Sequence, residues 1–150
     1  MRPEKIISGG QTGADQAGLY AAKELGIPTG GTAPPGYMTD EGPNLKLLTE
    51  FGLLVGPPDY KIYPIRTRKN VRDSDGTVWF GEVNSPGGKL TLSTARDLGK
   101  PTLVNPTSQQ LSHWVEQYHI KVLNVAGNRE RKNPGITDRV IEILVDAFYE

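Results

Sequence analysis

The feature that most constrains the fold is a glycine-rich turn near the N-terminus, placed between an apolar run and a helical pattern. Ile6 and Ile7 predict a buried strand, and residues 15–25 predict a helix. The glycine-rich turn that connects them, up to the first residue of the helix, is Ser8-Gly9-Gly10-Gln11-Thr12-Gly13-Ala14-Asp15. A strand, a glycine turn and a helix in this order direct backbone N–H groups and a helix N-terminus toward one place. The order therefore indicates an anion-binding site.

A second interpretation of this turn stays open. The turn lacks the Gly-Lys-Ser/Thr of a Walker A loop and the G-x-G-x-x-G spacing of a dinucleotide fold, and Gly30-Gly31 stands where that fold has an acidic ribose ligand. Thr12 and Asp15 also have the spacing of a capping box, in which Asp15 would bond only the start of its own helix. We expect the anion site, with the capped helix as the alternative.

Strand and helix patterns alternate along the whole chain. Further strands are expected at 29–33, 53–55, 77–80, 102–104 and 121–125, and further helices at 43–49, 64–72, 91–98, 108–118 and 136–149. This alternation predicts an α/β fold with a mainly parallel sheet and helices on both faces. We expect a single domain over residues 1–150, with an irregular loop at 34–42 whose role the sequence leaves open.

Glycine-bearing loops follow three of the expected strands, after Ile7, Phe80 and Val125. In parallel sheets ligands bind beyond the carboxyl ends of the strands, so these loops should meet at one edge. Backbone donors, polar side chains and cations there suit a phosphate or another oxyanion. The expected binding residues are Gly9, Gly10, Gln11, Thr12, Gly13, Asp15, Ser85, Gly87, Gly88, Lys89, Thr91, Gly127, Asn128 and Arg129, with Arg131 as a further cation.

Composition excludes several functions. The chain has 17 basic and 17 acidic side chains, so its net charge does not favour nucleic acid or a membrane surface. It has no cysteine and two histidines, which argues against thiolate chemistry and a histidine metal cage. It shows neither a signal peptide nor an apolar run of about 18–20 residues, so we expect a cytoplasmic protein. No nucleophile–base pattern is visible, and binding is favoured over catalysis.

Four stretches, in order along nearly the whole chain, carry a family resemblance. They are the first glycine turn, Asn70-Val71-Arg72-Asp73-Ser74-Asp75-Gly76-Thr77, Gly87-Gly88-x-Leu90-Thr91, and Val125-Ala126-Gly127-Asn128-Arg129-Glu130 with Pro134-Gly135-Ile136. Together they resemble the molybdenum cofactor carrier family, which is similar in turn to the lysine-decarboxylase-like, cytokinin-activating phosphoribohydrolases. The resemblance implies a Rossmann-like three-layer subunit that forms a homo-oligomer, a dimer or tetramer.

The resemblance also implies a function. The protein would hold the molybdenum cofactor, a phosphorylated molybdopterin, and deliver it to apo-molybdoenzymes without a reaction of its own. The pterin's phosphate would lie on Gly9 to Thr12, with Gly87, Gly88 and Thr91 opposite. The phosphoribohydrolases carry a glutamate shortly after Pro-Gly-Gly-x-Gly-Thr, whereas no glutamate follows Pro86-Gly87-Gly88 through Thr94 here. A nucleotide-binding sensor or a nucleoside-monophosphate phosphoribohydrolase-like enzyme remains the alternative.

Large aromatic side chains give a second reason to expect an oligomer. Trp79, Trp114, Tyr118 and Phe148 would be exposed on a domain of this size unless the sheet and helices cover them. Symmetric pairing of helices is a common way to cover such residues.

Overall fold

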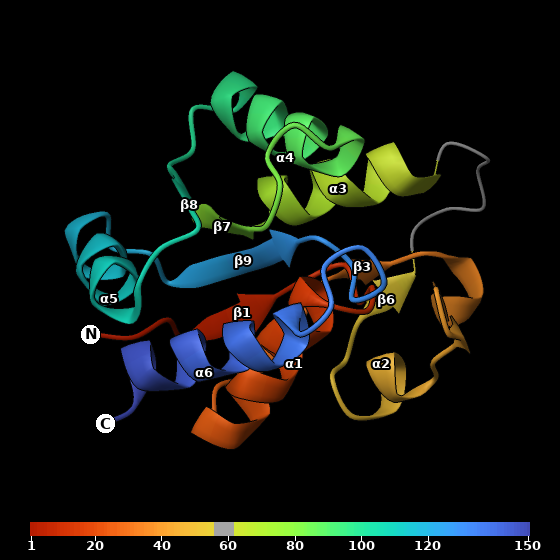
Figure 1. The fold of residues 1–150 in the computed structure, drawn as a ribbon, viewed down its shortest axis with the longest axis horizontal. Coiled ribbons are helices and arrows are strands. Elements are labelled where there is room, and N and C mark those ends of the chain that lie inside the picture. The colour runs from red at the N-terminus through yellow and green to blue at the C-terminus, as the bar shows by residue number, and fades with distance from the viewer. Residues whose placement is uncertain (56–61) are drawn as a thin grey trace.

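A central parallel sheet organises the computed structural model, which describes residues 1–55 and 62–150 (Figure 1). Within these residues the sheet has five strands in the order β2-β1-β9-β7-β8, and every neighbouring pair is parallel. Its strands are β1 (Lys5–Ile7), β2 (Thr29–Gly30), β7 (Gly76–Phe80), β8 (Thr102–Val104) and β9 (Val122–Gly127). The parallel sheet expected from the alternating pattern is confirmed.

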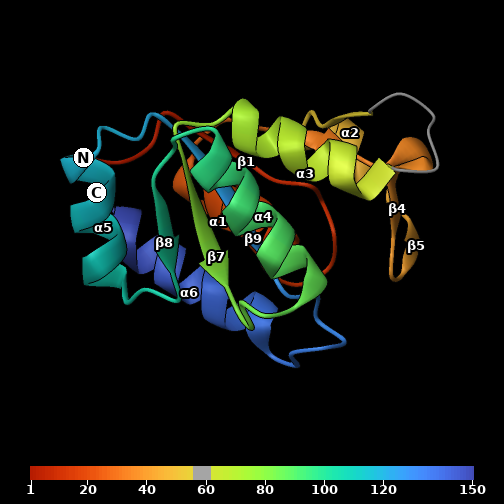
Figure 2. The same cartoon turned by 90° about the horizontal axis from the view of Figure 1, so that it is seen from above.

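Helices cover both faces of this sheet. One face carries α1 (Ala14–Leu25), α5 (Ser108–Gln117) and α6 (Ile136–Phe148). The other face carries α3 (Ile62–Arg72) and α4 (Pro86–Asp97), which lie side by side (Figures 1 and 2). The architecture is thus a Rossmann-like α/β fold of three layers, as expected.

The apolar core lies between the sheet and α1, α5 and α6. Alternate residues of a strand point to opposite faces, and Val78, Leu123 and Val125 point toward this core. The helices contribute small residues from α1 and larger residues from α6 to the same core. Gly18 of α1 faces Val125 closely enough that a Cβ there would lie 2.8 Å from the valine Cβ. The chain therefore presses α1 directly onto the strands that precede the predicted site.

The opposite face of the same strands is polar where α3 and α4 cover it. Thr77, Asn124 and Asn70 are all buried there. Asn124 Nδ2 donates to Thr77 Oγ1 at 3.2 Å, and the Asn70 amide bonds both the N–H and the carbonyl of Thr32, at 2.8 and 3.1 Å. These buried amides and hydroxyls make the layer between the sheet and α3 and α4 polar, in contrast to the apolar core on the other face.

The expected strand at 29–33 is wrong in one respect, because the structure divides it. Thr29–Gly30 joins the main sheet, whereas β3 (Thr32–Ala33) pairs in parallel with β6 (Leu54–Val55). The break falls at Gly31, whose φ is +127° and whose added Cβ would lie 2.1 Å from the Ser8 carbonyl oxygen. A close backbone crossing at this glycine therefore separates the two strands.

The segment between β3 and β6 forms a small layer beside α1. It contains a 3-10 turn η1 (Pro35–Tyr37), the hairpin β4 (Met38–Thr39) with β5 (Gly42–Pro43), and α2 (Lys46–Thr49), a helix shorter than the expected 43–49. A separate apolar cluster fills this layer, made of Leu19, Ala33, Leu47, Phe51 and Leu53. The loop at 34–42 is thus ordered against the first helix.

The sheet and helices of a single chain cover three of the four large aromatic residues that would otherwise be exposed. The exposed fractions of Trp79, Trp114 and Phe148 are 3%, 6% and 1%, whereas Tyr118 is 51% exposed. A second subunit is not required to cover the first three, so the oligomer prediction keeps the family resemblance and Tyr118 as its reasons. No helix in the described part of the chain has the length and apolar character needed to cross a bilayer.

Candidate functional site

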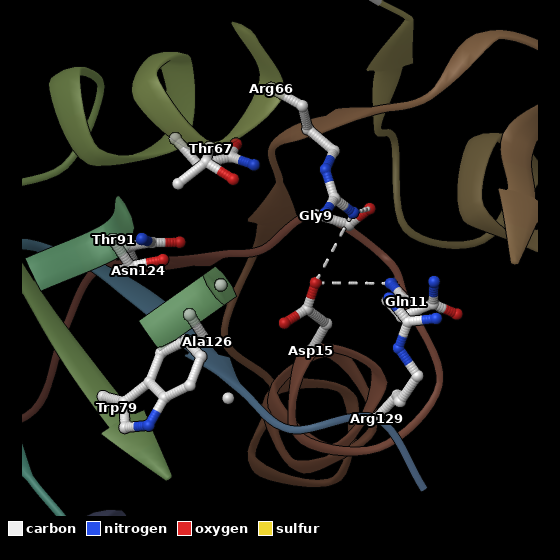
Figure 3. A pocket seen from close by; sticks show the side chains of 13 residues that line it. Gly9, Gln11, Asp15, Arg66, Thr67, Trp79, Thr91, Asn124, Ala126 and Arg129 are labelled. Carbon is white, nitrogen blue, oxygen red and sulfur yellow. Dashed lines mark hydrogen bonds and ion pairs between the residues drawn. The ribbon is translucent and has the colours of Figure 1, made fainter. Parts of the chain in front are cut away.

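The candidate site lies near the middle of the sheet, where the strands that follow in sequence are added toward opposite edges. From β1 the chain moves outward to β2 at one edge, from β7 it moves outward to β8 at the other, and β9 lies between β1 and β7. This switch point opens a crevice at the carboxyl ends of the strands, the usual ligand position in such folds. A cavity of about 110 Å³ lies there (Figure 3), lined by Gly9, Gln11, Asp15, Arg66, Thr67, Asn70, Trp79, Gly87, Thr91, Asn124, Ala126, Gly127 and Arg129.

All three glycine loops contribute to this cavity, each through part of its predicted set. The expected residues that line it are Gly9, Gln11, Asp15, Gly87, Thr91, Gly127 and Arg129. The expected residues outside its lining are Gly10, Thr12, Gly13, Ser85, Gly88, Lys89 and Asn128.

Sequence reasoning missed the part of the wall that comes from α3 and the strands. Arg66 lies in the expected helix at 64–72 together with Arg68, Lys69 and Arg72, and such a concentration of basic residues is typical of a solvated helix face. The Arg66 side chain is nevertheless only 13% exposed. Trp79 and Asn124 point from β7 and β9 into the polar layer. A polar Asn124 between apolar strand neighbours was a usable signal, whereas the inward turn of Arg66 depends on tertiary packing.

Asp15 is the central charge of the cavity. Its Oδ2 accepts a hydrogen bond from the Gln11 N–H at 3.3 Å and lies 3.8 Å from Arg66 Nη1, which donates to the Gly9 carbonyl at 3.0 Å. Burial raises the pKa of Asp15 to about 6, against the lowering effects of the Arg66 charge and the Gln11 and Gly9 N–H groups. The raised pKa means that the nearby charge and N–H groups do not fully offset the loss of hydration of the ionised carboxylate.

The first loop uses several of its own N–H groups. Beyond the Gln11 bond to Asp15, the Thr12 N–H donates to Gln11 Oε1 at 2.9 Å, and the Ala14 N–H donates to the Asn128 carbonyl at 3.1 Å. A phosphate on this loop would therefore compete with Asp15 and Gln11 for the same donors. This is a property of the folded loop that the glycine pattern does not reveal.

The capping-box interpretation of this loop is wrong. Helix α1 begins after Gly13, which has no side-chain cap, and Thr12 Oγ1 is buried without a hydrogen-bond partner among the described residues. Gly13 instead allows close approach, since its φ is +86° and an added Cβ would lie 2.3 Å from the Asn128 carbonyl oxygen. Gly10 faces the small layer, where a Cβ would lie 2.8 Å from Leu47 Cδ1. Both glycines shape the loop from outside the cavity.

The second loop presents the start of α4 to the cavity. Ser85 is the N-cap residue, and its Oγ accepts the Gly88 N–H at 3.1 Å. Gly88 is buried against the Val83 carbonyl, while Gly87 is exposed and Lys89 points to solvent. Gly87 and Thr91 are therefore the members of this loop that reach the cavity.

The 34–42 loop joins the first and third glycine loops. The Asp40 N–H donates to Gln11 Oε1 at 2.8 Å, and the Asp40 carboxylate pairs with Arg129 at 2.9 Å and with Arg131 at 3.7 Å. The two arginines expected to meet a ligand's phosphate thus already share a carboxylate. Arg129 also lines the cavity, so its positive charge lies at the cavity wall while the Asp40 carboxylate fixes the side chain in place.

Glu130 and Asn128 build the scaffold behind this wall. Glu130 accepts hydrogen bonds from the Gly135 N–H at 2.6 Å and from Thr137 Oγ1 at 2.7 Å, and these bonds lower the pKa of Glu130. Asn128 Oδ1 accepts the Glu82 N–H at 2.8 Å and so connects the third loop to the second. Within residues 1–55 and 62–150 no cluster of His, Asp or Glu could hold a metal ion.

Together these features define a Rossmann-like α/β protein with a polar cavity at its switch point. A sequence model of the circularly permutated YpsA SLOG family matches residues 6–148, and the chain belongs to this family. Its fold is similar to the crystal structure of a protein from Syntrophus aciditrophicus named "putative molybdenum carrier protein", with a TM-score of 0.84 and 35% identity. That similarity covers 99% of this chain and 96% of the other. A comparison with curated protein sequences gives no match.

Proposed function

We propose that this protein reversibly binds the molybdenum cofactor and holds it without transforming it. The observation that carries the proposal is the polar cavity at the switch point, formed by all three glycine loops in a chain that is similar throughout to a protein named as a molybdenum carrier. Two guanidinium groups, those of Arg66 and Arg129, line this cavity and suit an anionic ligand.

The size of the cavity restricts how such a ligand enters. About 110 Å³ is somewhat less than the roughly 150 Å³ of an engineered protein cavity that holds one benzene molecule. One end of a ligand fits this space, and the rest must extend through the mouth. Gly87 lies at that mouth, because it lines the cavity and is also exposed.

We place the ligand's phosphate at this mouth, beside the start of α4. Helix N-termini bind phosphates through N–H groups and the helix dipole. The first loop offers the same elements in principle, but the Asp15 carboxylate already occupies it and would repel a second anion. Lys89, in the first turn of α4 and exposed, can approach the phosphate from solvent.

The proposal includes the finer biology that the family resemblance implies. The cofactor would be protected in a cytoplasmic homo-oligomer, a dimer or tetramer, and passed to apo-molybdoenzymes. Light scattering at tens of micromolar tests the assembly, since a species of 16.4 kDa would contradict it.

A second candidate function is a nucleotide-binding sensor or a nucleoside-monophosphate phosphoribohydrolase-like enzyme. Asp15 favours it, because a buried carboxyl with a pKa of about 6 can exchange a proton near neutral pH. In this case the same cavity would receive a nucleotide's base or ribose.

The test is an anaerobic titration of the apo-protein with purified molybdenum cofactor, followed by transfer to an apo-molybdoenzyme. We expect saturable binding that weakens with added salt, and recovery of enzyme activity on transfer. A parallel incubation with nucleoside monophosphates measures release of free base. Base release without cofactor binding would replace the carrier proposal with the second candidate.

A further inference from the structure

The Asp15 carboxylate has acceptor capacity that the folded chain does not use. An ionised carboxylate has about four acceptor positions. The Gln11 N–H bond and the Arg66 contact both fall on Oδ2, and the Gly9 N–H also acts on the carboxylate. Figure 3 shows the other oxygen, Oδ1, turned into the cavity toward the side where Ala126 and the Trp79 ring lie. A carboxylate oxygen that faces the cavity can accept a hydrogen bond from a ligand that enters it.

We propose that Asp15 selects the ligand by accepting the adjacent N–H and NH₂ groups of a 2-amino-4-oxopyrimidine ring, the edge that pterins and guanine share. The inference rests on the proposed function in one respect, namely that a heteroaromatic ligand enters this cavity. It adds the direction of entry, with the amino edge inward at Asp15 and the phosphate outward at the mouth.

The wall around Asp15 suits the edge of a flat ring. Trp79 supplies an aromatic surface, and Ala126, Gly127 and Gly87 supply small surfaces that leave space beside it. An added Cβ on Gly87 would be 3.7 Å from Trp79 Cη2, an ordinary contact distance, so Gly87 and the Trp79 ring already lie close together. A flat ring would therefore not stack between these two residues, and its edge would reach the carboxylate beside Trp79.

The charges around Asp15 favour donors over a phosphate at this position. Arg66 from α3 and Arg129 from the third loop are the charged groups that act on Asp15. Arg66 already bonds the Gly9 carbonyl, and Arg129 is paired with Asp40. A phosphate placed against Asp15 would bring a second anion beside the carboxylate, whereas N–H donors would add hydrogen bonds to it.

The experiment compares ligands that differ at one exocyclic group. Pterin carries the 2-amino group, and lumazine replaces it by a 2-oxo group that would face the carboxylate with a second acceptor. We expect the protein to bind pterin at least about tenfold more tightly than lumazine by titration calorimetry. Phosphorylated pterin and GMP distinguish the two natural sources of this ring edge, and AMP, which lacks it, should bind more weakly than either.

Asp15→Asn makes the test specific to this residue. An asparagine donates where aspartate accepts, so the variant should lose the preference for pterin or reverse it toward lumazine. Asp138→Asn is the matched control, since Asp138 is exposed in the first turn of α6. Circular dichroism and thermal unfolding confirm that both variants fold.

The pH dependence gives a second readout, measured with unphosphorylated pterin so that no phosphate titrates. Affinity should fall about tenfold from pH 7.5 to pH 5, because Asp15 becomes protonated, and should be flat in Asp15→Asn. An affinity for pterin that rises as pH falls would contradict the ionised Asp15 carboxylate as the acceptor. Equal binding of pterin and lumazine, while phosphorylated pterin or the cofactor still binds, would overturn the role of Asp15 and leave the proposed function standing. Absence of binding by all these ligands would overturn both.

Discussion

Asp15 and Glu130 are two carboxylates at the same edge of the sheet, each beside the start of a helix, yet their surroundings differ. Glu130 is partly exposed and accepts bonds from Gly135 and Thr137, which lower its pKa. Asp15 also accepts a loop N–H and faces Arg66, but burial outweighs both and raises its pKa to about 6. Hydrogen bonds alone do not decide whether a carboxylate is ionised, because the loss of hydration on burial can raise its pKa by more than the hydrogen bonds lower it. Glu130 supports the scaffold, whereas Asp15 keeps capacity for a ligand.

The largest effect should follow from removing the cation beside Asp15. Arg66→Ala leaves the carboxylate buried without its ion pair, and we expect a loss of about 3–5 kcal/mol in the free energy of unfolding at pH 8. The loss should shrink at pH 5, where Asp15 is protonated. Denaturant unfolding at both pH values measures it. Arg72→Ala is the control on the same helix, because its pair with Asp73 is exposed and should change stability by less than about 1 kcal/mol. An equal loss at both pH values would contradict the electrostatic cause.

A somewhat smaller effect is expected from the titration of Asp15 itself. Its pKa is raised in the folded state, so the folded protein binds more protons than the unfolded chain between about pH 4 and pH 6. This contribution to stability is present at low pH and is lost as pH rises, by about 3 kcal/mol in total. The difference in unfolding free energy between wild type and Asp15→Asn should therefore change over this range. Carbon NMR of the Asp15 carboxyl should give a midpoint near pH 6, and a midpoint near 4 would contradict the assignment.

The contribution of Glu130 to the free energy of unfolding should change with pH in the opposite direction to that of Asp15, and by a smaller amount. Its pKa is lowered on folding, so its contribution is present above the unfolded pKa and is lost as pH falls through the folded value. Glu130→Gln weakens the bonds that hold the start of α6, and we expect a cost of about 1 kcal/mol at pH 7 that disappears in acid. Unfolding curves at pH 7 and pH 3 measure this difference. If the contributions of Asp15 and Glu130 to the free energy of unfolding changed with pH in the same direction, the contrast between the two carboxylates would be wrong.

The smallest effect on stability should come from the mouth of the cavity. Gly87→Ala places a methyl group where a Cβ would meet Trp79 at 3.7 Å, and alanine favours the first turn of α4, so stability should change by less than about 1 kcal/mol. Cofactor or phosphorylated pterin should nevertheless bind more weakly, because the methyl occupies the passage. Unchanged affinity in the titration would move the entry route away from Gly87.

Much of the architecture follows from local patterns in the chain. The run Thr77-Val78-Trp79-Phe80, the capping box that starts α5 at Thr107 with Gln110, and Gly26 after α1 each reveal an element or its boundary. Parallel strands alternating with helices then bring three glycine loops to one edge. The position of the candidate site was predictable for this reason, since the carboxyl ends of parallel strands lie at one edge of the sheet whatever the order of the strands.

The identity of the groups inside the cavity depended on contacts between distant parts of the chain. Gln11 bonds Asp40, 29 residues away, and Arg66 reaches Gly9 across 57 residues. Neither contact has a local signature, because side-chain direction and burial are set by which elements pack together. The raised pKa of Asp15 has the same origin. Glycine spacing and hydrophobic periodicity determine the sheet, its helices and the edge where loops gather, and three-dimensional packing alone decides which donors are already used and which carboxylate oxygen still faces the cavity.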